Sequence, residues 1–361
     1  MNYNIEGTMS EPLVSVLIPC YNVENYVLES ISSILDQTYQ NIEVIAIDDC
    51  STDTTKQKLE QLASKDARLK VYHNEVNLKL IKTLNKGIEL CNGKYIARMD
   101  ADDIALPTRL EKEVRFLEQN ADYSIVSTMF YTFKSGSSKK NLYKNPVQYD
   151  ELQAYLLFKS GICHPAVMIR KTLFTEKGLA FEQAYLHVED YALWSKALYC
   201  SKLANIDEPL LLYRVHETQV STLNEKSQIN NKKEVFKIHC EKLGLPTDSY
   251  YLDIYASVAE SDPLHTSLDY IIECEKFMKL LIRKNEEIQF CSHPYLLKML
   301  SIHWIRLCAN SRLGLKVLNI CSASSLYNRQ NYSNQDLVIL YIKCLFKMEY
   351  KKSFLYKILF R

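Results

Sequence analysis

Short apolar runs alternate with stretches of helical spacing through the first 120 residues, and this alternation restricts the fold more than any other feature. The first run, residues 14–18 (VSVLI), is short and rich in β-branched residues, which is typical of a strand buried on both faces. Comparable runs occupy residues 42–47, 69–72 and 95–99. Repeated strand–helix units predict an α/β fold with a mostly parallel, Rossmann-like sheet flanked by helices.

Between these runs, apolar residues recur at the spacing of a helix that buries one face. Val27, Ile31 and Ile34, for example, stand at i, i+4 and i+7. Pro107 is expected in the first turn of a later helix, because proline is favoured at that position. In sheets of this kind, ligands bind beyond the carboxyl ends of the strands. The polar segments 19–22, 48–49 and 100–103 all fall there.

The chain of 361 residues is long enough for one large domain and a smaller one. Residues 125–213 have a mixed pattern, and the polar stretch 222–233 is either a linker or the exposed start of a helix. Beyond it the spacing is helical, with one face formed by Leu268, Ile271, Cys274, Met278 and Leu281. We therefore expect an α/β domain over residues 1–230 and a helical C-terminal domain over residues 231–361.

The composition excludes several classes of protein. With 44 Lys and Arg against 43 Asp and Glu, the net charge is +1, so nucleic acid is not an expected partner. The 11 cysteines contain no CxxC pair, which favours reduced thiols in a cytoplasmic setting. The N-terminus lacks the basic start and apolar core of a signal peptide. Because no apolar run approaches the ~18–20 residues of a membrane helix, we expect a cytoplasmic protein that at most lies on the inner face of a membrane.

Residues 99–103 (MDADD) carry the strongest chemical signal. Three carboxylates within four residues repel one another unless a cation neutralises them, and oxygen ligands suit a hard ion such as Mg²⁺ or Mn²⁺. The alternative is a solvated acidic turn that caps the following helix. Similarly, the pairs at 48–49 and 189–190 are explained either as ligand-binding carboxylates or as residues at helix starts.

Five ordered motifs closely resemble the family-2 glycosyltransferases, which adopt the GT-A fold. They are SVLIPCYNVENYVLESISSILDQTYQNIEVIAIDDCSTD (residues 15–53), NGKYIARMDADDIALPTRL (92–110), HPAVMIRK (164–171), VEDYALWSKA (188–197) and YRVHETQVS (213–221). Together they span about residues 12–221. The resemblance implies an inverting transferase that moves a hexose or N-acetylhexosamine from a UDP-sugar to an acceptor hydroxyl, with a divalent metal, and forms a β-linkage.

The resemblance also implies roles for individual residues. Asp49 is expected to read the uracil edge, Asp100 to approach the ribose, and Asp190 to act as the general base. Asp102, Asp103 and His216 are expected to hold Mn²⁺ or Mg²⁺. The further residues expected to contact the nucleotide-sugar are Pro19, Tyr21, Asn22, Glu24, Asn85, Asp102 and Arg214.

Some of these assignments have a structural alternative. His216 beside Arg214 is also explained by a local hydrogen bond, and His164 before Pro165 is more simply a structural residue. Where many relatives have a Gly-rich Asn-x-Gly segment, this chain has NEVNLKLIKTLNKGI (74–88), and either Lys79 or Lys82 is a candidate diphosphate contact.

Other functions are less consistent with the sequence. There is no GxGxxG motif for a dinucleotide, no P-loop and no nucleophile elbow. A sugar nucleotidyltransferase would need a Gly-rich basic loop after the first strand, and a non-catalytic nucleotide-sugar-binding module would not need residues 102, 103 and 190. Both remain alternatives.

The acceptor is expected to be a glycan or a lipid-linked saccharide. Family members of this size often build bacterial surface glycans, so lipopolysaccharide or capsule biosynthesis is the expected context. The C-terminal tail, residues 343–361, has six Lys or Arg against one Glu, interleaved with aromatic and aliphatic residues. Such a segment is typical either of a peripheral membrane contact or of a last helix packed on its own domain.

Overall fold

The computed structural model describes residues 11–216 and 225–348, and its contacts divide the chain into two compact units. The first unit contains the chain up to residue 147 together with segments 162–183 and 196–223. The second contains segments 148–161 and 184–195 and the chain from residue 224 onward. Because the chain passes between the units several times, a single boundary near residue 230 does not describe this division. That two independently folding domains meet near residue 230 stays a prediction.

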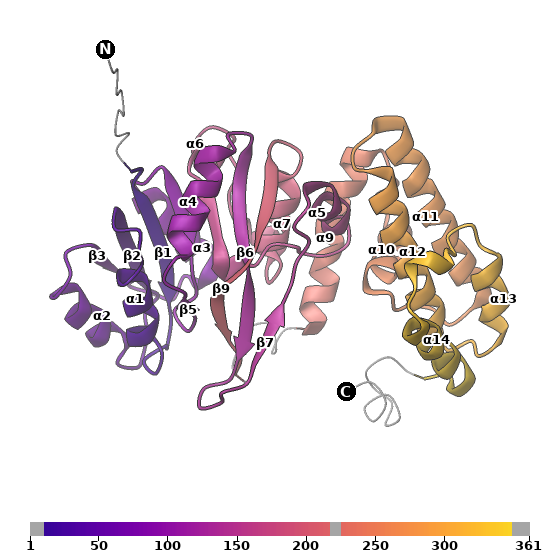
Figure 1. Cartoon of the computed structure of the whole chain (residues 1–361), viewed down its shortest axis with the longest axis horizontal. Helices are drawn as coiled ribbons and strands as arrows, with labels where there is room; N and C mark the ends of the chain where they lie inside the picture. Colours follow the sequence, from indigo (N-terminus) through magenta and orange to yellow (C-terminus); the bar gives the residue numbers. More distant parts are fainter. Residues whose placement is uncertain (1–10, 217–224, 349–361) are drawn as a thin grey trace, which may run out of the picture. The chain divides into compact units, whose positions relative to one another are not determined.

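The first unit is built on a nine-stranded sheet with the order β3-β2-β1-β4-β8-β6-β9-β5, in which β7 pairs with β6 (Figure 1). The first four strands are parallel, and β8 then joins β4 in the antiparallel direction. The predicted α/β sheet is thus confirmed, although its later half is mixed. The strands are β1 (Val14–Cys20), β2 (Ile42–Asp48), β3 (Leu69–His73), β4 (Tyr95–Arg98), β5 (Ile104–Ala105), β6 (Tyr123–Phe133), β7 (Lys140–Tyr143), β8 (Val167–Arg170) and β9 (Lys202–Arg214).

Helices flank this sheet and bury one face each, as their spacing predicts. In α1 the residues with complete burial include Val27, Ile31 and Ile34. The helices of this part of the chain are α1 (Val27–Leu35), α2 (Thr55–Ala63), α3 (Lys79–Leu90), α4 (Arg109–Gln119) and α6 (Thr172–Thr175), with short 3₁₀ turns η1 (His164–Ala166) and η2 (Gln183–Tyr185, whose last two residues belong to the second unit).

The expected place of Pro107 in the first helical turn is wrong. Helix α4 begins at Arg109 with Thr108 as its N-cap, so Pro107 precedes the helix. The Pro107 carbonyl accepts a hydrogen bond from the Thr38 backbone N–H at 2.8 Å. This contact links Pro107 to the segment after α1.

The second unit is helical. Its helix α11 buries the predicted face, including Ile271, Cys274 and Met278. Residues 225–233 of the polar stretch form the start of α9, which confirms the helical alternative for that part. The helices are α5 (Tyr149–Leu156), α7 (Glu189–Ala197, whose last two residues belong to the first unit), α9 (Glu225–Leu243), α10 (Ser249–Glu260), α11 (Leu268–Ile288), α12 (His293–Asn310), α13 (Lys316–Ala323) and α14 (Asn334–Phe346), with η3 (Arg329–Asn331).

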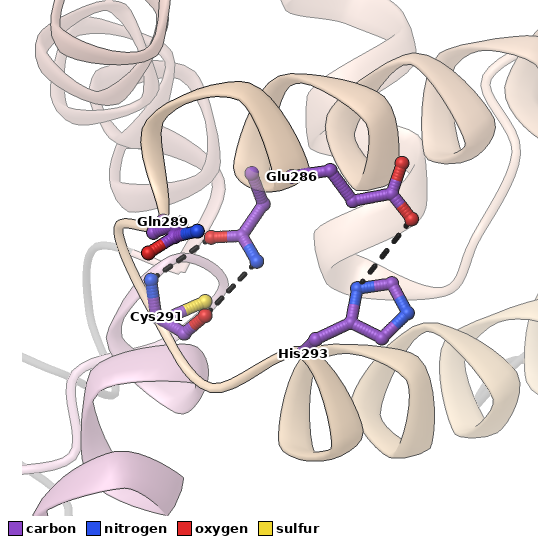
Figure 2. A pocket seen from close by; sticks show the side chains of 5 residues that line it. Glu286, Gln289, Cys291 and His293 are labelled. Atoms are coloured by element: carbon purple, nitrogen blue, oxygen red, sulfur yellow. Dashed lines mark hydrogen bonds and ion pairs between the residues drawn. The ribbon is translucent and has the colours of Figure 1, made fainter.

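Figure 2 shows the turn that joins α11 to α12. The side-chain amide of Asn285 donates to the Cys291 carbonyl and accepts from the Cys291 N–H, both at 2.9 Å. Gln289 ends α11 in the left-handed region, with φ of 49°. The hollow beside this turn, about 410 Å³, is therefore lined by groups that close the helix end.

None of the described helices combines the length and the apolar character needed to cross a bilayer. Residues 349–361, which carry most of the predicted membrane-contacting tail, lie outside the described residues.

Candidate active site

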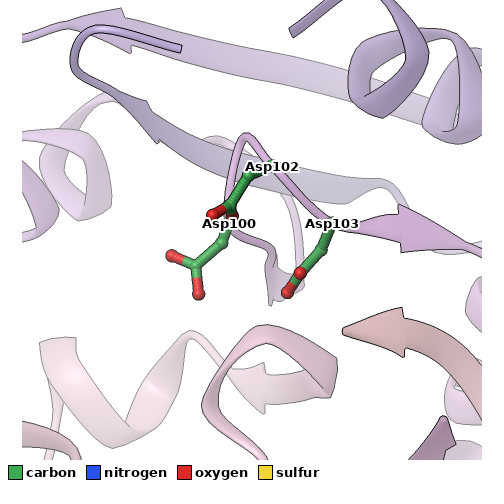
Figure 3. A group of neighbouring side chains, drawn as sticks. All are labelled: Asp100, Asp102 and Asp103. Carbon is green, nitrogen blue, oxygen red and sulfur yellow. The ribbon is translucent and has the colours of Figure 1, made fainter. Parts of the chain in front are cut away.

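Three carboxylates gather in the turn that follows β4 (Figure 3). Oxygen atoms of Asp100, Asp102 and Asp103 all lie within 4.8 Å of one another. The Asp103 backbone N–H donates to the Asp100 carbonyl at 3.2 Å, which closes the turn. The predicted acidic cluster at the carboxyl end of a strand is therefore present.

Asp103 is the most deeply buried of the three, with a relative exposure of 0%. Its Oδ1 accepts a hydrogen bond from the Arg214 backbone N–H at 2.9 Å, whereas its Oδ2 has no hydrogen-bond partner among the described residues. Burial, reinforced by the charges of Asp100 and Asp102, raises the pKa of Asp103 well above its ordinary value. A buried carboxylate oxygen without a partner is costly, and a cation would relieve that cost.

The two neighbouring carboxylates have different partners. Arg98 forms a bidentate pair with Asp100, at 2.7 and 2.5 Å. Burial raises the pKa of Asp100, which the charge of Arg98 opposes and that of Asp102 reinforces. Asp102 Oδ2 lies 2.8 Å from Nε2 of His216, and the His216 ring stacks on Tyr26 with centroids 5.5 Å apart.

These donors fit a hard divalent cation. Asp102 and Asp103 provide carboxylate oxygens, one of which lacks a partner, and carboxylate oxygens are the ligands that Mg²⁺ and Mn²⁺ prefer. Asp100 is instead held by Arg98. The contact of His216 with Asp102 agrees equally with a metal ligand and with the local hydrogen bond considered above.

Arg214 is held inside the first unit. Its guanidinium donates to the Asp102 carbonyl, to Ser135 Oγ and to the Glu29 carboxylate, each at 2.6 Å. It also lies over the Tyr26 and Phe133 rings, 4.8 and 4.6 Å from their centroids. These contacts hold Arg214 against the acidic turn. Its contact with a diphosphate stays a prediction.

Glu29, Ser135 and Phe133 contact Arg214 beside the acidic turn, and no sequence motif pointed to them. Glu29 is an ordinary acidic residue in the first turn of α1. Phe133 ends β6 and Ser135 follows it, and the pairing of β6 with β9 places Phe133 beside Arg214. Hydrophobic periodicity does not indicate such residues, because their position beside the acidic turn depends on which strands pair.

The loop after β1 is linked to the loop after β2. Asn22, with φ of 51°, accepts from the Thr52 N–H at 2.9 Å and donates its own N–H to Ser51 Oγ at 3.0 Å. Glu24 accepts from the Thr54 N–H at 3.1 Å. Asn22 and Glu24 therefore shape the loop, whereas Tyr21 is 46% exposed and Pro19 lies within β1.

Asp49 is buried directly after β2 and receives three hydrogen bonds. Its Oδ1 accepts from the Asn74 amide and the Leu78 N–H, both at 2.8 Å, and its Oδ2 accepts from the Lys79 N–H at 2.9 Å. A carboxylate has about four acceptor positions, so these three hydrogen bonds do not fill its capacity, and its contact with uracil stays a prediction. Asn74 is a further partner that the sequence did not indicate.

Asn85 links α3 to the segment near residue 181. Its amide donates to the Phe181 carbonyl at 2.7 Å and accepts from the Phe181 N–H at 3.1 Å. These contacts occupy both ends of the side-chain amide, so its predicted contact with the nucleotide-sugar stays a prediction. Lys79 and Lys82, the candidate diphosphate contacts, are exposed on the first turn of α3.

Asp190 lies in the second unit, in the first turn of α7. Its Oδ1 accepts from the Tyr191 N–H at 2.7 Å, and the Tyr191 hydroxyl donates to the Leu156 carbonyl at 2.8 Å. Asp190 is half-buried, whereas Glu189 is only 8% exposed. Of the two acids, Asp190 is therefore the more accessible to a reacting group.

His164 stands in η1, where its ring lies 5.4 Å from the Phe181 ring. Burial, assisted by the charge of Arg98, lowers the pKa of His164 well below its ordinary value. A neutral, packed imidazole agrees with the structural role considered above.

Comparison with known proteins gives one consistent result. The model of the family described as "Glycosyl transferase family 2" matches residues 15–177. An uncharacterized glycosyltransferase of Haemophilus influenzae is 38% identical over 232 residues, covering 62% of this chain and 72% of that protein. The Escherichia coli UDP-Glc:alpha-D-GlcNAc-diphosphoundecaprenol beta-1,3-glucosyltransferase WfgD is 29% identical over 59% of this chain and 81% of its own length.

Among solved structures, S. aureus TarS 1–349 in complex with UDP-GlcNAc matches with a TM-score of 0.54. The match covers 88% of this chain and 89% of that chain, at 18% identity. It covers 52% of a longer TarS chain. At this identity the likeness shows the fold.

Proposed function

This chain belongs to glycosyltransferase family 2, and we propose that it is an inverting, metal-dependent enzyme that transfers a hexose or N-acetylhexosamine from a UDP-sugar to an acceptor hydroxyl. One observation carries the proposal: the buried Asp103 carboxylate, with an oxygen that lacks a partner among the described residues, beside Asp102 at the carboxyl end of β4. A non-catalytic sugar-binding module would not need this arrangement.

The donor side is supported by residues around the first two loops. Asp49 accepts three hydrogen bonds, and we assign the remaining acceptor position of its carboxylate to the uracil N–H. Tyr21, which directly precedes Asn22, exposes an aromatic ring. WfgD uses UDP-Glc by its name, and TarS binds UDP-GlcNAc. These relatives support a uridine nucleotide as the carrier and leave the sugar itself open.

When bound, the divalent metal would neutralise charge on the departing diphosphate as a Lewis acid. Asp102 and Asp103 would hold it, with His216 as a third candidate ligand. Asp190 removes the proton of the acceptor hydroxyl as the acceptor oxygen bonds to the anomeric carbon. The bond from that carbon to the UDP oxygen breaks at the same time, on the opposite face. An α-linked donor therefore gives a β-linked product.

The acceptor is proposed to be a glycan or lipid-linked saccharide of a bacterial surface glycan. WfgD acts, by its name, on a sugar linked to diphosphoundecaprenol and forms a β-linkage. The same proposal places the enzyme at the cytoplasmic face of the membrane, with peripheral membrane contact.

The test is transfer from a panel of UDP-sugars, measured as release of free UDP. Wild-type turnover should require Mn²⁺ or Mg²⁺ and stop in EDTA, and Asp103→Asn should lose at least about 10²-fold in rate, the range of one electrostatic contact in an active site. Circular dichroism should show the variant folded. Glu111→Gln, which alters a half-exposed acid of α4 that accepts from Thr38 and pairs with Arg115, is the matched control and should keep wild-type activity. Normal turnover of Asp103→Asn in EDTA would overturn the metal-dependent mechanism.

A further inference from the structure

Asp100 differs from the other two carboxylates of the acidic turn, because both of its oxygens accept from one guanidinium. Arg98 Nη1 donates to Asp100 Oδ2 at 2.7 Å, and Arg98 Nη2 donates to Asp100 Oδ1 at 2.5 Å. In this fork geometry a guanidinium holds a carboxylate most firmly. The function proposed above assigns no role to Arg98, although it contacts the acidic turn directly.

The local sequence places Arg98 and Asp100 on the same side of the chain. Residues two apart in an extended segment point the same way, and Met99 between them is fully buried in the core of the sheet. Arg98 is the last residue of β4, and its side chain is only 4% exposed. A guanidinium so deeply placed acts on the site through Asp100 rather than as a surface contact for a diphosphate.

The backbone that carries this pair is held by its neighbours. Arg109 of α4 is fully buried, donates from Nη2 to the Arg98 carbonyl at 2.8 Å, and pairs with Glu113 at 3.1 Å. At the next residue, the Met99 N–H donates to the Leu17 carbonyl of β1 at 3.2 Å. These contacts fix the end of β4, and with it the direction in which the Arg98 side chain leaves the strand.

The position of Asp100 would otherwise suit a third metal ligand. One oxygen of each of Asp100, Asp102 and Asp103 lies within 4.8 Å of the other two, so a small movement would let one cation contact all three. The number of charged oxygen ligands tunes the affinity of a protein site for a divalent cation. A neighbouring positive charge opposes cation binding. Arg98 acts on both quantities, since it occupies one carboxylate and adds a positive charge.

We propose that Arg98 is a positioning residue that withholds Asp100 from the metal, so that two carboxylates rather than three hold the cation. The metal site of the protein alone is then weak, and the diphosphate of the donor completes it with further oxygens. The inference rests on the proposed function, from which it takes the divalent cation and the UDP-sugar.

The experiment measures Mn²⁺ binding to the full chain without nucleotide, by titration with electron paramagnetic resonance of the free ion. Arg98→Gln should bind Mn²⁺ at least about tenfold more tightly than wild type, because it frees a carboxylate ligand and removes a positive charge. Arg98→Lys keeps the charge but lacks the fork, so its gain should be smaller. A damaged fold would lower the affinity, so a merely structural role for Arg98 does not predict this gain.

Two controls assign the gain to the freed carboxylate. Asp100→Asn added to Arg98→Gln should remove the gain, as expected of two residues that act through one contact. Arg170→Gln removes a half-buried arginine at the opposite end of β4, where Arg170 lies across from Tyr95 and donates to its hydroxyl at 3.0 Å. That variant should bind Mn²⁺ as wild type does.

A further comparison leaves the buried Arg98 in place. Asp100→Asn and Asp102→Asn make the same change of charge, but only Asp102 is a metal ligand in this proposal. Asp102→Asn should therefore weaken Mn²⁺ binding much more than Asp100→Asn does. Equal losses in these two variants would overturn the proposal, even if both Arg98 variants fail to fold.

The outcomes also separate this inference from the proposed function. If wild type transfers sugar only with a divalent metal, but neither Arg98 variant binds Mn²⁺ more tightly, the inference alone fails. A gain that persists when Asp100→Asn is added to Arg98→Gln comes from charge alone and overturns the positioning role. If wild type transfers sugar at full rate in EDTA, the proposed metal dependence fails, whereas a tighter Mn²⁺ site in Arg98→Gln would still support the withheld ligand.

Discussion

Two buried carboxylates of the first unit, Asp49 and Asp103, have different surroundings. Asp49 receives three hydrogen bonds and organises the start of α3, whereas Asp103 keeps an oxygen without a partner among the residues that the structure describes. The first arrangement stabilises a charge with protein donors, whereas the second leaves an oxygen for the cation that the proposed function requires. The proposal therefore assigns the two aspartates different roles because their local donors differ.

At this scale, Asp190→Asn tests the proposed general base. The substitution keeps size and shape but removes the proton acceptor, so kcat should fall by at least about 10²-fold. UDP affinity should stay within about twofold, because the base meets the acceptor rather than the nucleotide. Steady-state kinetics and UDP titration measure both quantities.

Glu189→Gln is the matched comparison for Asp190→Asn. Glu189 is 8% exposed, so its replacement should affect stability more than kcat. If Glu189→Gln is inactive while Asp190→Asn keeps a near-native kcat, the two roles are exchanged. Full activity of both variants would leave the single-displacement mechanism without its base.

Glu43 gives a stability prediction with a definite pH dependence. Burial alone would raise its pKa, but hydrogen bonds from Lys70, Ser15 and Asn92 prevail and lower the pKa to about 2. A carboxyl group whose pKa is lowered by folding stabilises the fold above its unfolded pKa, and this contribution is lost as the pH falls through the folded pKa.

Glu43→Gln should therefore lower the free energy of unfolding by about 2–3 kcal/mol at pH 7. The difference from wild type should shrink between about pH 4.5 and pH 2, as the wild-type carboxyl group protonates. Urea unfolding at pH 7, 4 and 2.5 measures it. A difference that is the same at all three pH values would contradict the assigned role of the charge.

At the scale of elements, the segment just before β4 packs closely against the backbone at the start of β1. A Cβ placed on Gly93 would lie 2.6 Å from the Ser15 nitrogen and 2.7 Å from the Leu13 oxygen. Ser15 lies in β1 and Leu13 directly precedes it, so neither backbone atom can move without disturbing the sheet.

Gly93→Ala should consequently destabilise the protein by about 2–4 kcal/mol or prevent folding, as overpacking against a rigid neighbour does. Gly136→Ala is the control, because Gly136 has φ of 76° but no atom near its added Cβ. That variant should cost about 1 kcal/mol from backbone strain alone. Denaturation midpoints of the two variants compare the effects, and equal midpoints would refute the close-approach argument.

The parallel strands and the acidic turn could be predicted because their signals are local. Buried β-branched runs predicted β1 to β4 to within two residues, and Asp100 to Asp103 follow β4 directly. The antiparallel entry of β8 and the placement of α5 in the helical unit could not be predicted. They depend on contacts between distant segments, such as the hydrogen bond from the Gln153 side chain to the Phe290 carbonyl. Such contacts produce no periodic pattern in the sequence.

At the scale of the whole molecule, α14 has two different faces. Leu340 and Cys344 are buried in the helical unit. The two alternatives for the tail, residues 343–361, fall mostly outside the described residues and stay predictions. Val338, Tyr341 and Leu345 stand three and four residues apart and are 55%, 58% and 60% exposed. This spacing places them on one side of the helix.

An exposed apolar stripe next to a basic, aromatic-rich tail is typical of a helix that lies in a membrane interface. The tail, residues 349–361, lies outside the described part of the chain, but its lysines and arginine add charge that anionic lipids attract by about 1 kcal/mol each. We therefore expect the full chain to float with phosphatidylglycerol vesicles, and to do so less as salt concentration rises.

Two variants separate the stripe from the tail. Tyr341→Ser combined with Leu345→Ser should reduce recovery with vesicles several-fold, because it removes apolar area without changing charge. A chain cut before Glu349 should lose the salt-dependent part of the binding and keep the rest. Val76→Ser, which changes an apolar residue of the first unit that is 62% exposed, should float as wild type does. If the full chain, the double variant and the truncated chain are recovered equally, α14 makes no membrane contact and its exposed face needs another explanation.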